Sequence, residues 1–170
     1  MHELLVLRHA KSRWDEPGST DHDRGLAPRG IEAAKRMGRL IQERGWLPDR
    51  ILCSTAMRAS ATLDLAMRGW PDSPPIPLEH ARRLYLASPE TLLRLVREQP
   101  RATRRLLVVG HNPGLATFVL TLAGRGDAAA FDTIGHKLPT AAVARLALDR
   151  WHDVGWGGAT LLDFVRPKDL

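Results

Sequence analysis

The sequence predicts a three-layer α/β/α sandwich built around a mostly parallel central sheet. Short apolar runs alternate with longer segments that carry apolar residues at helical spacing, which is the order of repeated βα units. One run, "RLLVVG" at 105–110, is almost entirely apolar, as expected for a parallel strand that is buried on both faces. The chain has 170 residues and 44% hydrophobic content, so we expect one core and a single domain over 1–170.

The expected strands are short apolar runs, most of them rich in Leu, Val and Ile. The run "PIPLE" contains prolines, which sheets accept only at an edge. The expected strands cover 4–7, 50–53, 75–79, 105–110, 141–148 and 159–165.

Helices are expected between these strands, with start signals typical of helix N-termini. Serine is a good N-cap, proline suits a first helical turn, and glycine often follows a helix end. The helices run from Pro28 to about Gly45, from Ser54 through Met67, from Ser88 through Val96, and from Asn112 to about Ala123. The polar stretch from 12 to 26 is long for a plain connection, which is typical of a functional loop.

Composition excludes several classes of function. The formal net charge is +6, but the arginines are spread along the chain and only 5% of residues are aromatic, so we expect no nucleic-acid partner. A positive surface favours anionic substrates and acidic proteins. No apolar run is long enough to cross a bilayer and the start of the chain lacks secretory-signal features, so we expect a cytoplasmic protein without membrane contact. The single Cys53 suits a reducing compartment and is expected to be a buried small hydrophobe.

Reactive side chains follow three of the expected strands. The first strand ends in Arg8 and His9, the second leads into a segment with Arg58, and 105–110 is followed by His111. In open α/β sheets, ligands bind beyond the carboxyl ends of the strands, so we expect these residues to meet. Taken alone, each is more often structural than catalytic.

Two histidines and two arginines in one pocket suit phosphoryl transfer. A neutral imidazole can attack phosphorus, and arginine offers planar, permanently charged donors to the phosphoryl oxygens. A metal site is the weaker interpretation, because two histidines lack a third ligand and the arginines repel a cation; His22, between Asp21 and Asp23, is the remaining ligand candidate. We therefore expect neither a metal nor another cofactor.

Four segments resemble motifs of the histidine phosphatase superfamily, whose fold is that of phosphoglycerate mutase. These are "LRHAKS", "GLAPRG", "STAMRASAT" and "GHNPG", in the family's order. The short chain and the segments "RHAKSRW", "DHDRGL" and "RRLYLAS" are similar to the SixA-type phosphohistidine phosphatases. The resemblance implies that His9 is the phosphoryl-accepting nucleophile, that Arg8, Arg58 and His111 form the phosphate pocket, and that Ser12 lies near the phosphate.

The chain also departs from the family pattern. Ala10 replaces a usual glycine, and Asp15 stands where mutase-like members often carry asparagine, which disfavours a second phosphate. Larger members carry an acidic general acid between the second and third motifs, where this chain offers Glu79. Glu79 is equally well interpreted as that acid or as an exposed loop residue.

A weak or missing general acid favours an N–P substrate over an O–P one. An alkoxide needs a proton donor to leave, whereas the conjugate acid of imidazole has a pKa of about 6.5 and leaves readily near neutral pH. We therefore expect a phosphatase acting on phosphohistidine of a signalling or phosphocarrier protein. The alternatives are a broad small-molecule phosphomonoesterase using Glu79 or Asp15 as acid, a non-catalytic phosphoprotein-binding module, and a basic nucleic-acid binder.

The segment Phe131–Val143, "FDTIGHKLPTAAV", has two interpretations. It borders the pocket, with Lys137 or Thr140 contacting substrate, or it is a loop entering a strand, which we favour. The sequence leaves the oligomeric state and the identity of the phosphorylated partner open.

Overall fold

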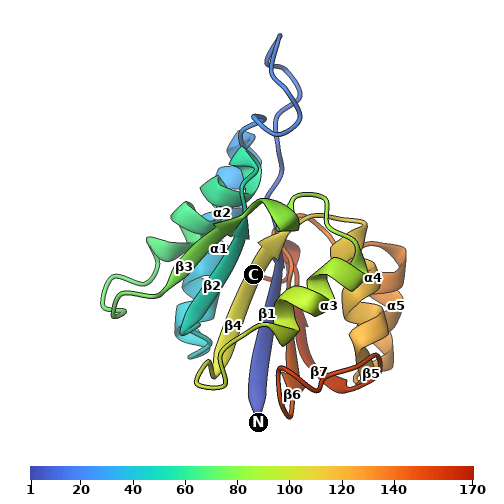
Figure 1. Cartoon of the computed structure of the whole chain (residues 1–170). Helices are drawn as coiled ribbons and strands as arrows, with labels where there is room; N and C mark the ends of the chain where they lie inside the picture. Colours follow the sequence, from blue (N-terminus) through green and yellow to red (C-terminus); the bar gives the residue numbers. More distant parts are fainter.

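A mixed sheet with helices on both faces organises the chain (Figure 1). The computed structural model describes all residues 1–170. The strand order is β3-β2-β4-β1-β6-β7-β5, and only β6 runs against the others. The strands are β1 His2–Arg8, β2 Arg50–Ser54, β3 Leu78–Ala81, β4 Arg105–Gly110, β5 Ala123–Arg125, β6 Val143–Leu148 and β7 Ala159–Val165. The predicted three-layer, mostly parallel architecture is confirmed.

Five α-helices flank the sheet, together with two short 3₁₀ turns. The helices are α1 Pro28–Glu43, α2 Met57–Met67, α3 Pro89–Arg97, α4 Gly114–Leu122 and α5 Ala128–His136; the turns are Arg82–Leu84 and Pro167–Asp169. Figure 1 shows α1 and α2 on one side of the sheet and α3, α4 and α5 on the other. No helix is long and apolar enough to span a membrane.

Two large hydrophobic cores lie between the sheet and the helix layers, one on each face of the sheet, and successive residues of a strand point alternately into one or the other. Leu5 and Leu7 of β1 pack with α1 and α2, whereas Leu4 and Val6 pack with α3 and α4 on the opposite face. Both faces of β1 are thus buried, because the strand lies in the middle of the sheet. This burial fixes the register of β1 against its neighbours, since a slip of one residue would exchange its two apolar faces.

Two glycines allow close helix contacts. A Cβ on Gly38 of α1 would lie 2.2 Å from the carbonyl oxygen of Ala66 in α2. A Cβ on Gly114, at the start of α4, would lie 1.9 Å from the carbonyl oxygen of Ala87. Larger side chains at these positions would force the backbones apart. Close packing therefore explains why the last residue of "GHNPG", Gly114, is a glycine.

The expected elements need three corrections, the first of which is that β3 spans Leu78–Ala81 and not 75–79. Ser54 does not cap α2: the helix begins after Ala56, and the Ser54 hydroxyl instead faces His111. The helix α5 and the short strand β5 were not predicted, because the segment from 123 to 136 contributes few buried residues and shows little apolar periodicity. In contrast, Ser88 caps α3 as predicted by accepting a hydrogen bond from the Thr91 N–H.

Candidate active site

The candidate site lies at the carboxyl ends of β1, β2 and β4. Arg8 pairs with Gly110 in the parallel β1–β4 ladder, so the next residues, His9 and His111, become neighbours. The His9 N–H donates to the Gly110 carbonyl at 3.1 Å, and the two imidazole rings lie 5.2 Å apart between centroids. Ser54 ends β2, with its Oγ 2.7 Å from His111 Nε2. Strand register therefore joins residues that are about a hundred positions apart.

Two arginines complete the cluster, and both are anchored to backbone oxygens. Arg58, on the first turn of α2, is only 3% exposed and donates from Nη1 to the Asp21 carbonyl at 2.7 Å. The Arg8 Nη1 donates to the Leu138 carbonyl at 2.9 Å. Because at least one terminal nitrogen of each guanidinium is held by the protein, the remaining donors have a fixed direction.

A cavity of about 420 Å³ opens over this cluster. Its lining includes the five residues that the resemblance places at the phosphate, namely Arg8, His9, Ser12, Arg58 and His111. The other lining residues are Lys11, Trp14, Asp21, Arg24, Leu86, Asn112 and Thr140. Four cations and one carboxylate line it, so the cavity carries a positive field suited to an anion.

The tautomer of His9 follows from one hydrogen bond. Its Nδ1 lies 2.7 Å from the carbonyl oxygen of Ala10, which can only accept, so the hydrogen resides on Nδ1 and the lone pair on Nε2. Burial, together with the charges of Arg58 and Arg8, lowers the pKa of His9 to about 4, although the bond to Ala10 acts in the opposite direction. His9 is therefore neutral near pH 7 and presents a free nitrogen lone pair.

The backbone that orients His9 is itself held from α2. The Ala10 N–H donates to Thr62 Oγ1 at 2.9 Å, while the Thr62 hydroxyl donates to the Arg58 carbonyl at 2.6 Å. Thr62 follows Arg58 by one helical turn and is completely buried. A single threonine thus couples the position of the histidine loop to the helix that carries Arg58.

His111 is also held neutral. Burial, followed by the nearby His9 and Arg58, lowers its pKa to about 3. Its Nδ1 is buried and lacks a hydrogen-bond partner, as do the Nε atoms of Arg8 and Arg58. These three are the only buried side-chain nitrogen or oxygen atoms in the chain without a partner. Unpaired buried polar atoms are costly, so their confinement to this cluster indicates that the cluster is suited to binding a polar ligand.

Asp21 and Arg24 also belong to the site, although neither was assigned a role from the sequence. Arg24 donates to Ser12 Oγ at 2.6 Å and to Asp21 Oδ1 at 3.0 Å, while Arg58 Nη2 donates to Asp21 Oδ2 at 3.1 Å. The Tyr85 hydroxyl also donates to Asp21, and this bond with the two arginines holds the carboxyl pKa far below its usual range. Asp21 is therefore a fixed anion that orients both arginines. Sequence spacing gave no signal, because these contacts connect a loop to two distant elements.

The structure does not bring Glu79 or Asp15 into the cavity. Glu79 is exposed on the edge strand β3, which continues two residues beyond it to Ala81, so Glu79 does not occupy a strand end. Asp15 is exposed and pairs with Arg13 at 3.0 Å. His22, the metal-ligand candidate, bonds through Nε2 to Thr55 Oγ1 at 2.8 Å. No group of three or more His, Cys, Asp or Glu side chains is placed to share a metal ion.

The segment 131–143 is not only a loop entering a strand. Its first half belongs to α5, and Thr140 in its second half lines the cavity, whereas Lys137 does not. Leu138 contributes the carbonyl oxygen that holds Arg8. The pocket-bordering interpretation, which we did not favour, therefore describes the position of Thr140.

Comparisons with known proteins agree with this geometry. A model of the histidine phosphatase superfamily (branch 1) matches residues 4–85, which include His9 and Arg58. An uncharacterized protein of Mycobacterium tuberculosis is 39% identical over 165 residues, covering 95% of this chain and all of that protein. SixA from Agrobacterium tumefaciens is 30% identical with a TM-score of 0.83, covering 98% of both chains. SixA from Nakamurella multipartitia is 28% identical with a TM-score of 0.81, covering 98% of this chain and 96% of that one.

Proposed function

Because this chain belongs to the histidine phosphatase superfamily, we propose that it removes phosphoryl groups from phosphohistidine on a protein, through a phosphohistidine on its own His9. The observation that carries the proposal is the set of three unpartnered buried nitrogens on Arg8, Arg58 and His111, beside a neutral His9. The similarity to the Agrobacterium tumefaciens SixA, a protein named as a phosphohistidine phosphatase, supports the same substrate class.

The first chemical step uses the lone pair of His9 Nε2. This nitrogen attacks phosphorus in line and a new N–P bond forms. The N–P bond to the substrate ring breaks, and that ring leaves as neutral imidazole because its other nitrogen carries a hydrogen. Arg8 and Arg58 balance the charge on the equatorial oxygens throughout. We assign the hydrogen of the neutral His111 ring to Nδ1, with the Ser54 hydroxyl donating to Nε2, so that Nδ1 serves as a further donor to the phosphoryl group.

The second step is hydrolysis of the phosphoenzyme. Water attacks phosphorus, the N–P bond to His9 breaks, and inorganic phosphate leaves. The bond from Nδ1 to the Ala10 carbonyl keeps the ring in place and returns it to the same neutral tautomer. Thr62 holds Ala10 through both steps, so the nucleophile does not need to be repositioned between them.

The preference for an N–P bond rests on the absence of a carboxylic acid able to give a proton. Asp21 is the only carboxylate that lines the cavity, and Tyr85, Arg24 and Arg58 keep it ionised. An alkoxide leaving group would therefore lack a strong donor, whereas an imidazole leaving group does not need one. The mechanism makes no use of Glu79.

A substrate panel tests this assignment. A phosphohistidine peptide, a phosphoserine peptide and a sugar phosphate are compared by kcat/KM with a chelator present throughout. We expect the phosphohistidine peptide to be preferred by about two orders of magnitude or more, the usual size of a general-acid contribution. Glu79→Gln and Asp15→Asn serve as controls that should change nothing. Faster hydrolysis of the sugar phosphate, with loss of that activity in Glu79→Gln, would establish the phosphomonoesterase alternative instead.

A further inference from the structure

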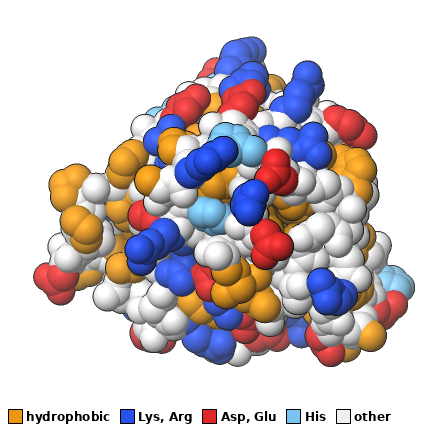
Figure 2. All heavy atoms as spheres, turned by 60° about the horizontal axis from the view of Figure 1, so that its bottom comes forward, with side chains coloured by type: hydrophobic (Ala, Val, Ile, Leu, Met, Phe, Trp, Pro, Cys, Tyr) orange, Lys and Arg blue, Asp and Glu red, His pale blue; other side chains and the backbone are white.

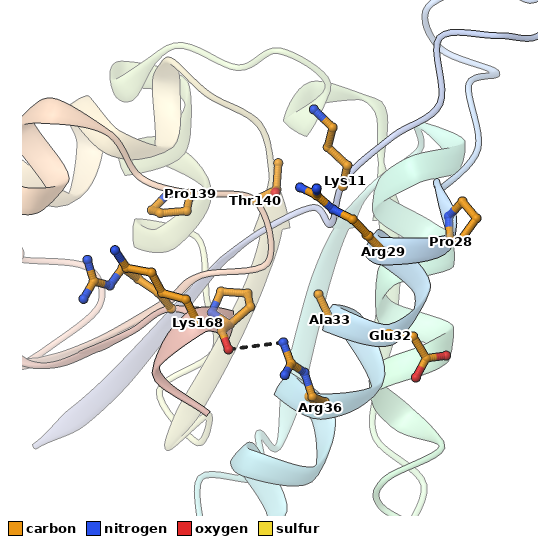
Figure 3. Close-up of a pocket in the computed structure, with 11 residues that line it drawn as sticks. Lys11, Pro28, Arg29, Glu32, Ala33, Arg36, Pro139, Thr140 and Lys168 are labelled. Atoms are coloured by element: carbon orange, nitrogen blue, oxygen red, sulfur yellow. Dashed lines mark hydrogen bonds between the residues drawn. The ribbon is translucent and has the colours of Figure 1, made fainter.

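A second and larger concavity lies directly beside the candidate active site. It encloses about 780 Å³ between the first half of α1, the loop at Pro139 and Thr140, and the C-terminal turn at Arg166–Lys168. Lys11 and Thr140 line both this groove and the cavity that contains His9. Figure 3 shows Lys11, Arg29 and Arg36 along one wall, with Pro139, Thr140 and Lys168 along the other. We call this concavity the basic groove.

Five of its eleven lining residues are cations, namely Lys11, Arg29, Arg36, Arg166 and Lys168. Arg166 is neutralised by Asp169 at 2.9 Å. The other four form no ion pair within the chain, and Arg36 donates only to the Pro167 carbonyl, at 3.2 Å. The single acidic lining residue, Glu32, pairs with Lys35 instead, at 3.3 Å.

Three of these cations, Lys11, Arg29 and Lys168, form no side-chain hydrogen bond or ion pair within the chain, unlike Arg36 and Arg166. Arg29 lies in the first turn of α1, where the partial positive charge of the helix end disfavours a cation. The groove also has rigid apolar surface from Pro28, Pro139 and Pro167, so it is preformed rather than dependent on flexible loops. A contrasting surface appears in Figure 2, which brings the lower end of the Figure 1 view forward and shows basic and acidic side chains interspersed.

We propose that the basic groove docks an acidic segment of the phosphoprotein whose phosphohistidine enters the adjoining cavity. The proposal rests on the proposed function, since the groove shares the lining residues Lys11 and Thr140 with the cavity that contains His9. Four unpaired cations match aspartate and glutamate side chains in charge, and the three prolines offer contact to the apolar parts of a peptide. The groove has no aromatic residue on which a nucleic-acid base could stack, which favours a protein over an RNA.

Docking of this kind acts on association more than on chemistry. Complementary charges raise the rate of encounter by about ten to a thousand times, and salt screens them over about 10 Å at 0.1 M ionic strength. A substrate without the acidic segment gains nothing from the groove. We therefore expect the groove to raise kcat/KM for acidic peptides relative to neutral ones, and this difference should become smaller as salt is added.

The test compares two phosphohistidine peptides of equal length, one flanked by three glutamates and the other by three glutamines. The groove variant carries Arg29→Ala, Arg36→Ala and Lys168→Ala, and it leaves Lys11 intact because that residue also lines the catalytic cavity. A matched control removes three exposed, unpaired arginines elsewhere, with Arg68→Ala, Arg101→Ala and Arg104→Ala. Arg101 and Arg104 precede β4 and so lie at the opposite end of the sheet from the site.

At low salt we expect the wild type to prefer the glutamate peptide at least about tenfold in kcat/KM. The groove variant should lose that preference, while the control variant should keep it. All three proteins should hydrolyse the phosphoramidate ion at equal rates, because it is too small to reach the groove. A groove variant that retains the full preference, or a wild type that shows none, overturns the docking proposal.

Two further readouts separate the remaining outcomes. If the wild type hydrolyses neither phosphoramidate nor either phosphohistidine peptide, the proposed function has failed. Binding of the unphosphorylated glutamate peptide, measured by fluorescence anisotropy, then tests the groove on its own. If a uridine oligonucleotide displaces that peptide at lower concentration than the peptide itself does, the groove is a nucleic-acid site and the docking proposal is wrong.

Discussion

The protonation of His9 makes the chemistry proposed here testable without any substrate. Burial and the neighbouring arginines lower its pKa to about 4, from an ordinary value near 6.5. The difference of about 2.5 units corresponds to about 3 kcal/mol of preference for the neutral ring. Near pH 5.5 an ordinary histidine is about nine-tenths protonated, whereas His9 should be about 3% protonated.

The assay is an NMR titration of the protein with ¹⁵N-labelled histidine, in which the two ring nitrogens give separate signals. We expect His9 to titrate near pH 4 and to carry its hydrogen on Nδ1 above that pH, because Nδ1 donates to the Ala10 carbonyl. The His9→Gln variant assigns the signals by removing them. A midpoint between pH 6 and 7, or a hydrogen on Nε2 at neutral pH, would refute the reasoning, since the lone pair would then be unavailable or wrongly placed.

The same shift has a consequence for stability. Between about pH 6.5 and pH 4 the unfolded chain binds a proton at this histidine and the folded protein does not, so the free energy of unfolding falls as pH is lowered through this range. His111 behaves in the same way, with a folded pKa of about 3. Urea unfolding of the wild type should therefore show a loss of stability on acidification that is smaller in His9→Gln.

Three substitutions extend the test to other residues. Arg58→Lys keeps the charge but loses the planar donor set, so kcat/KM for a phosphohistidine peptide should fall about a hundredfold or more in steady-state assays. A loss below about threefold would argue against the role of Arg58 in binding the phosphoryl group. Ser54→Ala removes the partner of His111 Nε2; kcat should fall about tenfold with KM little changed, and an unchanged kcat would remove Ser54 from the account. Gly38→Ala places a Cβ 2.2 Å from the Ala66 carbonyl oxygen and should lower the free energy of unfolding, measured in urea, by about 1–3 kcal/mol. Gly135→Ala should not lower it, because a Cβ there meets nothing within 4 Å. Equal stability of the two variants would contradict the packing described.

The sequence was most informative where one local pattern determines the structure. The strand at 105–110 was predicted with its observed limits, because a short uninterrupted apolar run between polar residues is typical of a strand that is buried on both faces. The meeting of Arg8, His9 and His111 followed from the rule that parallel strands end at one edge of the sheet. These inferences needed no knowledge of side-chain packing.

The sequence was least informative where function depends on pairs distant along the chain. Asp21 reaches Arg58 and Tyr85, which are 37 and 64 residues away, and nothing in the local pattern reveals those contacts. Ser54 was interpreted as a helix cap because its local context suits one, but its hydroxyl pairs with His111 from a neighbouring strand. Glu79 was considered as an acid from its place in the sequence order, although its strand continues past it.

The most direct measurement maps the phosphoryl group on the trapped enzyme. The protein is mixed with a phosphohistidine peptide, quenched in alkali to preserve N–P bonds, digested and analysed by mass spectrometry, with ³¹P NMR to identify the ring nitrogen. The account predicts phosphate on Nε2 of His9, none in His9→Ala, and an unchanged yield in the exposed-histidine control His136→Ala. Phosphate on His111, or wild-type turnover by His9→Ala, would contradict the central claim that His9 is the nucleophile.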